Sequence, residues 1–366
     1  MKTHAPGGNY EEVLSMKIVV LAGGISPERD VSLCSASLIS NALLKKGHEV
    51  AFVDVYTGFP KSVDLESADL KSSFVTKESG RTFSYKIPET EPDLEALIAE
   101  NGGRRELIGP GVLEICKMAD AVFLGCHGGM GENGRLQAVL DCFNIPYTGS
   151  GYIGCSLAMD KNLSKTLFSK SDIPTPKWML FDPSKDSMSD VIETLGFPCA
   201  VKPTGCGSSC GVSLVHNEAE WKAAIEYSTK YESICLIEEM IKGREFSVGV
   251  LDGEALPPIE IRPKQGFYDY KNKYQADATE EICPAPLPQE KTKEVQELTL
   301  AVHRLLRLGN YSRVDFILSE KDGKFYCLEA NNLPGMTPIS LLPQEALAVG
   351  ISYEDLCERL VLSAVR

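Results

Sequence analysis

The segment from Arg313 to Pro338 restricts the possible folds more than any other part of the chain. It predicts two strands joined by a turn at 321–324, because apolar residues flank that turn on both sides. Asp315 stands among apolar neighbours in the first strand, and the second strand ends at Glu329 and Asn331. A carboxylate in a core strand is unfavourable unless it is paired or bound to a cation. The segment therefore predicts either a hairpin with solvent-facing acids or a cation site.

The polar side chains of this hairpin offer only oxygen ligands. Glu329 and Asn331 point to the same face of their strand, because side chains alternate along a strand. Oxygen donors of this kind suit Mg²⁺, which usually takes one or two carboxylates together with phosphate oxygens. Asp315, Glu329 and Asn331 are therefore the candidate metal ligands.

Length and composition exclude several classes of protein. The 366 residues predict two or three domains, and 43% hydrophobic with 24% charged residues is typical of a soluble globular chain. A net charge of -14 argues against a nucleic-acid partner, and no apolar run is long enough to span a membrane. The polar first 15 residues lack a signal-peptide core, and the 12 cysteines have no repeated spacing. We therefore expect free thiols and a cytoplasmic location.

The N-terminal part predicts alternating strands and helices. A buried-type strand over 16–22 ends at Gly23-Gly24, a helix over 26–46 follows, and the next strand covers 49–55. A strand, a glycine turn and a helix N-terminus form a junction suited to ligands, although the glycines also fit a purely structural turn. Glu28 favours a ligand, because an acid at that position needs no structural partner.

A second junction follows the strand predicted over 121–126. His127 stands at the end of this strand, before a glycine-rich run, and a helix over 135–143 comes next. The end of a strand is where α/β folds place ligands, but a histidine that caps a loop remains equally open. Between the two junctions, residues 61–105 predict a polar excursion with a short hairpin around Ser79-Gly80 and a helix near 92–100.

The middle of the chain predicts a phosphate-binding hairpin. Lys202 lies in a strand over 199–203, and the glycine- and serine-rich run 204–213 follows. Glycine allows backbone N–H groups to approach an anion, and serine hydroxyls add donors. The run is not a Walker A loop, because it lacks the terminal Gly-Lys-Ser/Thr. An ordinary hairpin is the alternative, which the lysine directly before the run disfavours.

The remaining segments predict regular elements around one irregular loop. Residues 264–283, rich in tyrosine and lysine, have no periodicity and predict a functional loop. We expect helices over 156–171, 184–196, 289–308 and 353–365, and strands over 178–181, 234–239 and 245–251.

Taken in order, these segments resemble the D-alanine–D-alanine ligase family of ATP-grasp enzymes. The resemblance covers almost the whole chain from Met16 onward, and the ordered set of motifs is highly specific. The matching motifs are G-G-I-S-P-E-R-D-V-S (23–32), C-H-G-G-M-G-E-N-G (126–134), Y-T-G-S-G (147–151), M-D-K (159–161), V-K-P-T-G-C-G-S-S-C-G-V-S (201–213), E-F-S-V (245–248), F-Y-D-Y-K-N-K-Y (267–274), R-V-D-F (313–316) and E-A-N-N-L-P-G-M-T (329–337).

The resemblance implies an α/β chain with the ATP-grasp fold, in which ATP lies between two antiparallel sheets. We expect an N-terminal extension over 1–15 and three α/β domains. These are a Rossmann-like domain over 16–148, a central ATP-grasp subdomain over 149–240, and a C-terminal domain over 241–366 with the metal and substrate site. A homodimer is the expected assembly.

The resemblance also implies the reaction and the residues that serve it. D-alanine and ATP would form a D-alanyl phosphate, which the amine of a second D-alanine would attack to give the dipeptide for peptidoglycan precursors. ATP contacts fall on Lys161, Lys202, Ser208, Ser209, Glu238, Ile241 and Glu245, and two Mg²⁺ (or Mn²⁺) ions on Asp315, Glu329 and Asn331.

The same resemblance places the substrates. Glu28 would hold the first ammonium group, with His127 near the carboxyl end of that substrate. Arg313 and the Gly335 backbone would stabilise the oxyanion, and Ser150 and Tyr274 would link with Glu28. Lys273, Ser340 and Leu341 would frame the second substrate.

Three alternatives remain open at this point. The first is a D-alanine–D-serine or D-alanine–D-lactate ligase of the same family, which tyrosine at 274 and leucine at 341 disfavour. The second is a silent nucleotide-binding protein, which the intact Lys202, Arg313 and Glu329 oppose. A Rossmann dehydrogenase is the third, and the chain lacks its G-x-G-x-x-G fingerprint.

Overall fold

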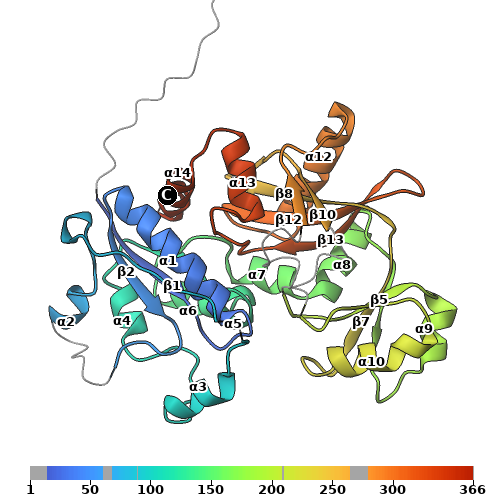
Figure 1. The fold of residues 1–366 in the computed structure, drawn as a ribbon, viewed down its shortest axis with the longest axis horizontal. Coiled ribbons are helices and arrows are strands. Elements are labelled where there is room, and N and C mark those ends of the chain that lie inside the picture. The colour runs from blue at the N-terminus through green and yellow to red at the C-terminus, as the bar shows by residue number, and fades with distance from the viewer. Residues whose placement is uncertain (1–14, 61–67, 89, 208–209, 264–278, 366) are drawn as a thin grey trace, which may run out of the picture.

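The computed structural model describes residues 15–60, 68–88, 90–207, 210–263 and 279–365. Three β-sheets follow one another along these ranges, with helices packed around each (Figure 1). None of the helices in the described ranges is long and apolar enough to cross a membrane.

The first sheet is parallel and has the order β2-β1-β3. It consists of β1 (Lys17–Ala22), β2 (Glu49–Asp54) and β3 (Ala121–Leu124), as the sequence predicted. Residues 18–22 are completely buried, which agrees with the continuous apolar run expected of a strand covered on both faces. Helix α1 (Arg29–Lys45) follows β1 and packs on both β1 and β2.

The excursion between β2 and β3 contains helices and little strand structure. The predicted hairpin around Ser79-Gly80 is wrong, because a single 3-10 turn, η1 (Lys77–Ser79), ends there at Gly80 with φ of 65°. The helix near 92–100 is confirmed as α3 (Leu94–Glu100), and Asp93 caps it by accepting from the backbone N–H of Ala96. The other helices of this unit are α2 (Ala68–Lys71), α4 (Val112–Cys116), α5 (Gly129–Glu132) and α6 (Arg135–Cys142).

The second sheet is antiparallel and has the order β4-β7-β5-β6. Its strands are β4 (Trp178–Phe181), β5 (Cys199–Pro203), β6 (Ser213–Val215) and β7 (Cys235–Glu239). β5 and β6 pair around the glycine-rich run, so the predicted hairpin is confirmed. Helix α9 (Met188–Thr194) is shorter than predicted, and α10 (Glu218–Ser228) was missed.

The helix predicted over 156–171 is two helices. α7 (Tyr152–Met159) ends where Asp160 takes an extended backbone conformation, with φ of -82° and ψ of 102°. α8 (Lys161–Lys170) then begins, and the Asp160 side chain accepts from the backbone N–H groups of Asn162 and Leu163. Because of this break, Lys161 stands in the first turn of α8.

The third sheet is antiparallel and contains the hairpin predicted within residues 313–338. β12 (Tyr311–Ser319) pairs with β13 (Phe325–Asn331) on one side and with β8 (Gly243–Leu251) on the other. The remaining strands are β9 (Glu254–Ala255), β10 (Ile259–Pro263) and β11 (Thr279–Ile282), and α12 (Gln289–Leu305) packs on β8 and β12. β10 and β11 were not predicted, and most of the expected functional loop lies outside the described residues.

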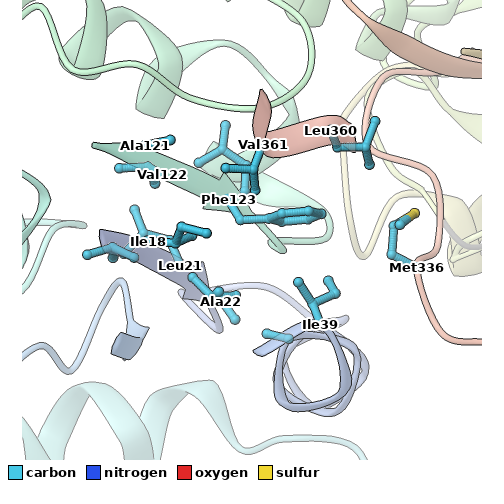
Figure 2. Packing of buried hydrophobic residues seen from close by; sticks show 14 of the residues in the cluster. Ile18, Leu21, Ala22, Ile39, Ala121, Val122, Phe123, Met336, Leu360 and Val361 are labelled. Atoms are coloured by element: carbon cyan, nitrogen blue, oxygen red, sulfur yellow. The ribbon is translucent and has the colours of Figure 1, made fainter. Parts of the chain in front are cut away.

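The C-terminal helices return to the first sheet. After α13 (Leu341–Ala348), α14 (Tyr353–Ala364) lies against α1 and β3 (Figure 1). Leu360 and Val361 share one hydrophobic cluster with Ile39 and Phe123, and Figure 2 shows these side chains together. The predicted domain boundaries remain a prediction, and the last residues of the chain complete the core of the first unit.

Candidate functional site

A cavity of about 660 Å³ lies between the second and third sheets. This volume is in the range of small-molecule sites. Apolar side chains from both sheets line it, and Ile241 and Glu245, both predicted ATP contacts, belong to its wall. The apolar lining residues are Pro176, Ala200, Val212, Leu214, Met240, Ile241, Ile261, Pro263, Ile317 and Leu328. Paired apolar walls of this kind suit a flat aromatic base.

Two of the predicted phosphate-binding lysines lie on this cavity. Lys202 Nζ is 2.7 Å from Glu238 Oε1, and Glu238 is buried with 3% of its surface exposed. Burial opposes the charge of Lys202, but Glu238 reverses the effect and the pKa of Lys202 is raised. Lys161 Nζ donates to the backbone oxygen of Cys206 over 2.6 Å and lies 3.4 Å from Glu329 Oε2. Lys202 is therefore charged at neutral pH, and the position of both lysines on the cavity suits a polyphosphate.

The three candidate metal ligands lie together on the central hairpin. Asp315 stands opposite Glu329 across β12 and β13, and Asn331 donates its side-chain N–H to Asp315 Oδ2 over 2.9 Å. Arg313 donates to both oxygens of Asp315, over 3.0 and 2.9 Å, and Ser247 donates to Oδ1 over 2.6 Å. The Asp315 carboxylate is thus fixed in orientation by its neighbours.

The donor set fits a magnesium ion that is completed by a ligand. The Asn331 amide uses its nitrogen on Asp315, so its oxygen is the atom that it can offer to a cation. No group of three or more His, Cys, Asp or Glu side chains with metal-binding geometry occurs in the described ranges. Two carboxylates and one amide oxygen fall short of a complete protein cage, and Mg²⁺ usually fills such a shell with phosphate oxygens and water.

A second group of polar residues closes one side of the site. Glu28 and His127 come from the first unit and are 7% and 8% exposed. Burial lowers the pKa of His127, against the charge of Glu28 and a hydrogen bond to the Leu333 backbone. The charge of Arg313 also acts on His127. Residues from the first and third units therefore meet here.

Glycines make the approach to Glu28 possible. A Cβ atom on Gly128 would lie 2.7 Å from Glu28 Oε2, and one on Gly207 would lie 3.0 Å away. Gly128 also has φ of 67°, which side chains rarely tolerate. The glycine-rich run of the second unit therefore covers the carboxylate of the first unit.

The residues expected around the second substrate lie at the start of α13. Ser340 caps that helix, and its Oγ accepts from the backbone N–H of Thr337 over 3.1 Å. A Cβ on Gly335 would lie 3.1 Å from the same oxygen. Leu341 is 4% exposed and belongs to one hydrophobic cluster with Ile259 and Ile261.

The other predicted residues stand apart from this group or outside the description. Ser150 is fully buried, and its Oγ accepts from the Gly309 backbone N–H over 2.9 Å. A link from Ser150 to Glu28 stays a prediction. Ser208, Ser209, Lys273 and Tyr274 lie outside the described residues.

Sequence reasoning missed two polar residues that shape the site. Ser247 holds Asp315, and the signal for it was a hydroxyl in the motif 245–248. Glu132 is 9% exposed, and burial together with the charge of Glu28 raises its pKa. Its Oε2 accepts from the Gly128 backbone N–H, which holds the loop beside Glu28. An acid within a glycine-rich run was the available signal.

Comparisons with known proteins place this geometry in context. Residues 17–150 match a family model described as D-ala D-ala ligase N-terminus, and residues 167–362 match the corresponding C-terminus model. The chain is 43% identical to D-alanine–D-alanine ligase of Pediococcus pentosaceus, over 95% of this chain and 97% of that protein. It is 40% identical to the enzyme of the same name from Lacticaseibacillus casei, over 94% and 95% of the two chains.

Solved structures agree in fold. The crystal structure of D-alanine–D-alanine ligase from Bacillus anthracis complexed with ATP superposes with a TM-score of 0.72 at 29% identity. The alignment covers 96% of this chain and 98% of that chain.

Proposed function

Because the chain belongs to the D-alanine–D-alanine ligase family and has its ATP-grasp fold, we propose that it joins two D-alanines to D-alanyl-D-alanine with ATP. ATP phosphorylates the carboxylate of the first D-alanine, and ADP leaves. The amine of the second D-alanine then attacks the acyl carbon, and phosphate leaves. The dipeptide serves peptidoglycan precursor synthesis.

One observation supports this function above all. The cavity between the two antiparallel sheets ends at Lys161, Lys202 and Glu329, while Glu28 and His127 approach Arg313 from the first unit. A nucleotide and a small amino acid would therefore meet between groups of suitable charge. Catalysis by positioning and charge stabilisation requires such a meeting point.

The chain's own residues have distinct tasks in this proposal. Lys161, Lys202 and the run with Ser208 and Ser209 hold the phosphates, and Glu238, Ile241 and Glu245 hold the adenosine. Glu28 binds the ammonium of the first D-alanine, and His127, neutral because burial lowers its pKa, lies near the carboxyl end.

The acyl-transfer step has its own residues. Arg313 is held by Asp315 close to His127, and we assign it, together with the Gly335 backbone, to the tetrahedral oxyanion. The link from Ser150 and Tyr274 to Glu28 is a separate prediction.

Magnesium or manganese completes the proposed site. Asp315, Glu329 and Asn331 would hold two such ions, which supply charge neutralisation to the transferring phosphoryl group. The donor set supports this assignment, because all three residues offer oxygen atoms and lie next to one another on β12 and β13.

We propose D-alanine as the second substrate in preference to D-serine and D-lactate. Leu341 and its apolar neighbours suit a methyl group and offer no partner to a hydroxyl, although such walls reject a hydroxyl only modestly. The assignment also includes Lys273 and Ser340 at this subsite.

Product analysis tests the function and the choice of substrate together. The enzyme is incubated with ATP, Mg²⁺ and equal D-alanine, D-serine and D-lactate near neutral pH, and mass spectrometry identifies the products. D-alanyl-D-alanine is the expected main product, with phosphate released only when D-alanine is present. A dominant D-alanyl-D-lactate or D-alanyl-D-serine peak would change the substrate assignment, and ATP binding without product would favour a silent nucleotide-binding protein.

Two features of the setting complete the proposal. All 12 cysteines are free thiols, which supports action in a reducing cytoplasm. A homodimer is the assembly that we propose, and light scattering at several protein concentrations would determine it.

A further inference from the structure

A buried lysine that the reaction does not yet explain lies behind the nucleotide cavity. Lys165 is completely buried and does not line the cavity, although Lys202 and Glu238 both do. It stands one helical turn after Lys161 on α8. A buried ammonium group without a ligand to contact needs a reason, because burial of a charge is unfavourable unless it is paired.

The partner of Lys165 is the same carboxylate that Lys202 contacts. Lys165 forms an ion pair with Glu238 Oε2, while Lys202 Nζ is 2.7 Å from Oε1. Glu238 therefore has one lysine on each oxygen. The two lysines lower the pKa of Glu238 although burial alone would raise it, so this residue is an anion at neutral pH.

Lys165 is fixed on the side of Glu238 that faces away from the cavity. Its Nζ donates to Thr175 Oγ1 over 2.6 Å, and Thr175 in turn donates to the Cys327 backbone oxygen over 2.8 Å. The ammonium group also lies 5.6 Å from the centre of the Trp178 ring. With Glu238, Thr175 and Trp178 around its ammonium group, Lys165 lies outside the lining of the cavity.

Lys202 differs from Lys165 in position, because it borders the cavity. An ammonium group has three donor protons, so Lys202 can contact Glu238 and a phosphate at the same time. A cation that two anions share neutralises each of them less completely. Glu238 would then be an undercompensated buried anion close to the negative nucleotide, which costs affinity.

We propose that Lys165 is a positioning residue that neutralises Glu238 from behind and so leaves the charge of Lys202 available to the nucleotide phosphates. The proposal rests on the proposed function, in which Lys202 contacts the phosphates. It gives Lys165 an effect on the phosphate-dependent part of ATP binding and little effect on the recognition of adenosine.

The test compares two ligands on the full-length protein. Calorimetry gives the dissociation constants for adenosine and for Mg²⁺–ATP in the absence of D-alanine. The ratio of the adenosine constant to the ATP constant reports what the phosphates contribute to affinity. Lys165→Met removes the charge and keeps the length of the side chain. The ratio should fall by about tenfold, which is an ordinary size for coupling between sites. Lys170→Met, an exposed lysine on the same helix, is the matched control and should leave the ratio unchanged.

A second variant separates charge from structural damage. Lys165→Met combined with Glu238→Gln removes the buried anion as well as its partner. No uncompensated buried charge then remains, so the ratio should return close to the wild-type value. This variant also decides the question when Lys165→Met alone does not fold. A ratio that stays low in the double variant would overturn the proposal, as would an equal loss of adenosine and ATP affinity in Lys165→Met.

Lys202→Met distinguishes the two levels of inference. If Lys202→Met lowers the ratio and Lys165→Met does not, only the role of Lys165 is overturned. If Lys202→Met leaves the ratio unchanged, the assignment of Lys202 to the phosphates fails, and the role of Lys165 fails with it.

Discussion

Charged side chains in strands define the chemistry of this protein at the scale of single residues. Asp315 and Glu238 both lie in strands with apolar neighbours, and both are almost completely buried. Each is held by cations, Asp315 by Arg313 and Glu238 by Lys165 and Lys202. Such pairs contribute little to stability, because desolvation offsets attraction, and their value lies in fixing charges where a ligand binds.

Glu329 is the residue whose charge we expect to matter most for turnover. Glu329→Gln keeps the shape of the side chain and removes a negative charge from the proposed metal site. Turnover should fall by on the order of a hundredfold or more, because metal ions stabilise the transferring phosphoryl charge by several kcal/mol. Steady-state kinetics at saturating ATP and Mg²⁺ measure the loss. Glu290→Gln, an exposed acid at the start of α12, is the control, and unchanged turnover in a folded Glu329→Gln variant would remove Glu329 from the site.

His303 gives a prediction for the pH dependence of stability. Its Nδ1 is 2.7 Å from Ser312 Oγ, and burial lowers its pKa from the ordinary value of 6.5. The unfolded chain therefore binds this proton more readily, so stability is lost as pH falls below 6.5 through the lower folded pKa. The free energy of unfolding in urea should decline more between pH 7.5 and 5.5 in wild type than in His303→Gln. Equal declines would contradict this account.

At the scale of elements, the start of α8 places Lys161 and Lys165. The chain changes direction at Asp160, and α8 begins with Lys161 in its first turn. Lys161 therefore points to Cys206 and Glu329, while Lys165, four residues later on the same helix, reaches Glu238. In a single continuous helix, the side chains of the two lysines would point in other directions.

The cap at Asp160 should couple stability to nucleotide binding. Asp160→Ala leaves the N–H groups of Asn162 and Leu163 without their partner and should cost about 1 kcal/mol of stability. The KM for ATP should rise as well, because Lys161 follows the cap directly. Urea unfolding and initial rates measure the two effects. Asp160→Asn should recover most of both, since asparagine is an equally good cap; failure of that recovery would assign Asp160 another role.

At the scale of the whole molecule, the first strand and the last helix of the described residues share one core. Helix α14 lies on α1 and β3 (Figure 1). Ion pairs of 2.9 and 2.8 Å join Lys45 to Glu354 and Lys46 to Asp355. Exposed pairs of this kind add little, so the buried side chains of α14 hold the contact. Tyr311 and Leu333 of the third unit belong to the same hydrophobic cluster, and Arg313 lies close enough to His127 for its charge to act on that residue.

Leu360 tests how strongly the unit depends on that contact. It is completely buried beside Val361, as Figure 2 shows. Leu360→Ala should lower the free energy of unfolding by about 2–5 kcal/mol, because a core cavity remains. Leu347→Ala is the control, since Leu347 is 64% exposed. Urea unfolding followed by fluorescence provides the measurement, and a loss no larger than that of the control would mean that α14 packs only loosely.

Local sequence patterns determined much of this fold. The apolar runs at 18–22 and 121–124 specify buried strands, and the turn between β12 and β13 lies where polar and glycine residues interrupt two apolar strands. The motifs were also sufficient to identify the family, because an ordered set of glycines, lysines and acids is much more specific than any one of them. These patterns are local, so they can be recognised in the sequence without the tertiary structure.

Only the tertiary structure decided what lies beyond the reach of such patterns. The break at Asp160 has no proline or glycine to mark it, and the excursion forms η1 where a hairpin was expected. Leu360 and Phe123 share one hydrophobic cluster although more than two hundred residues of sequence separate them, and the two cations of Glu238 come from different elements. Burial and charge pairing between distant segments set these features, because their energies depend on neighbours that the local sequence does not contain.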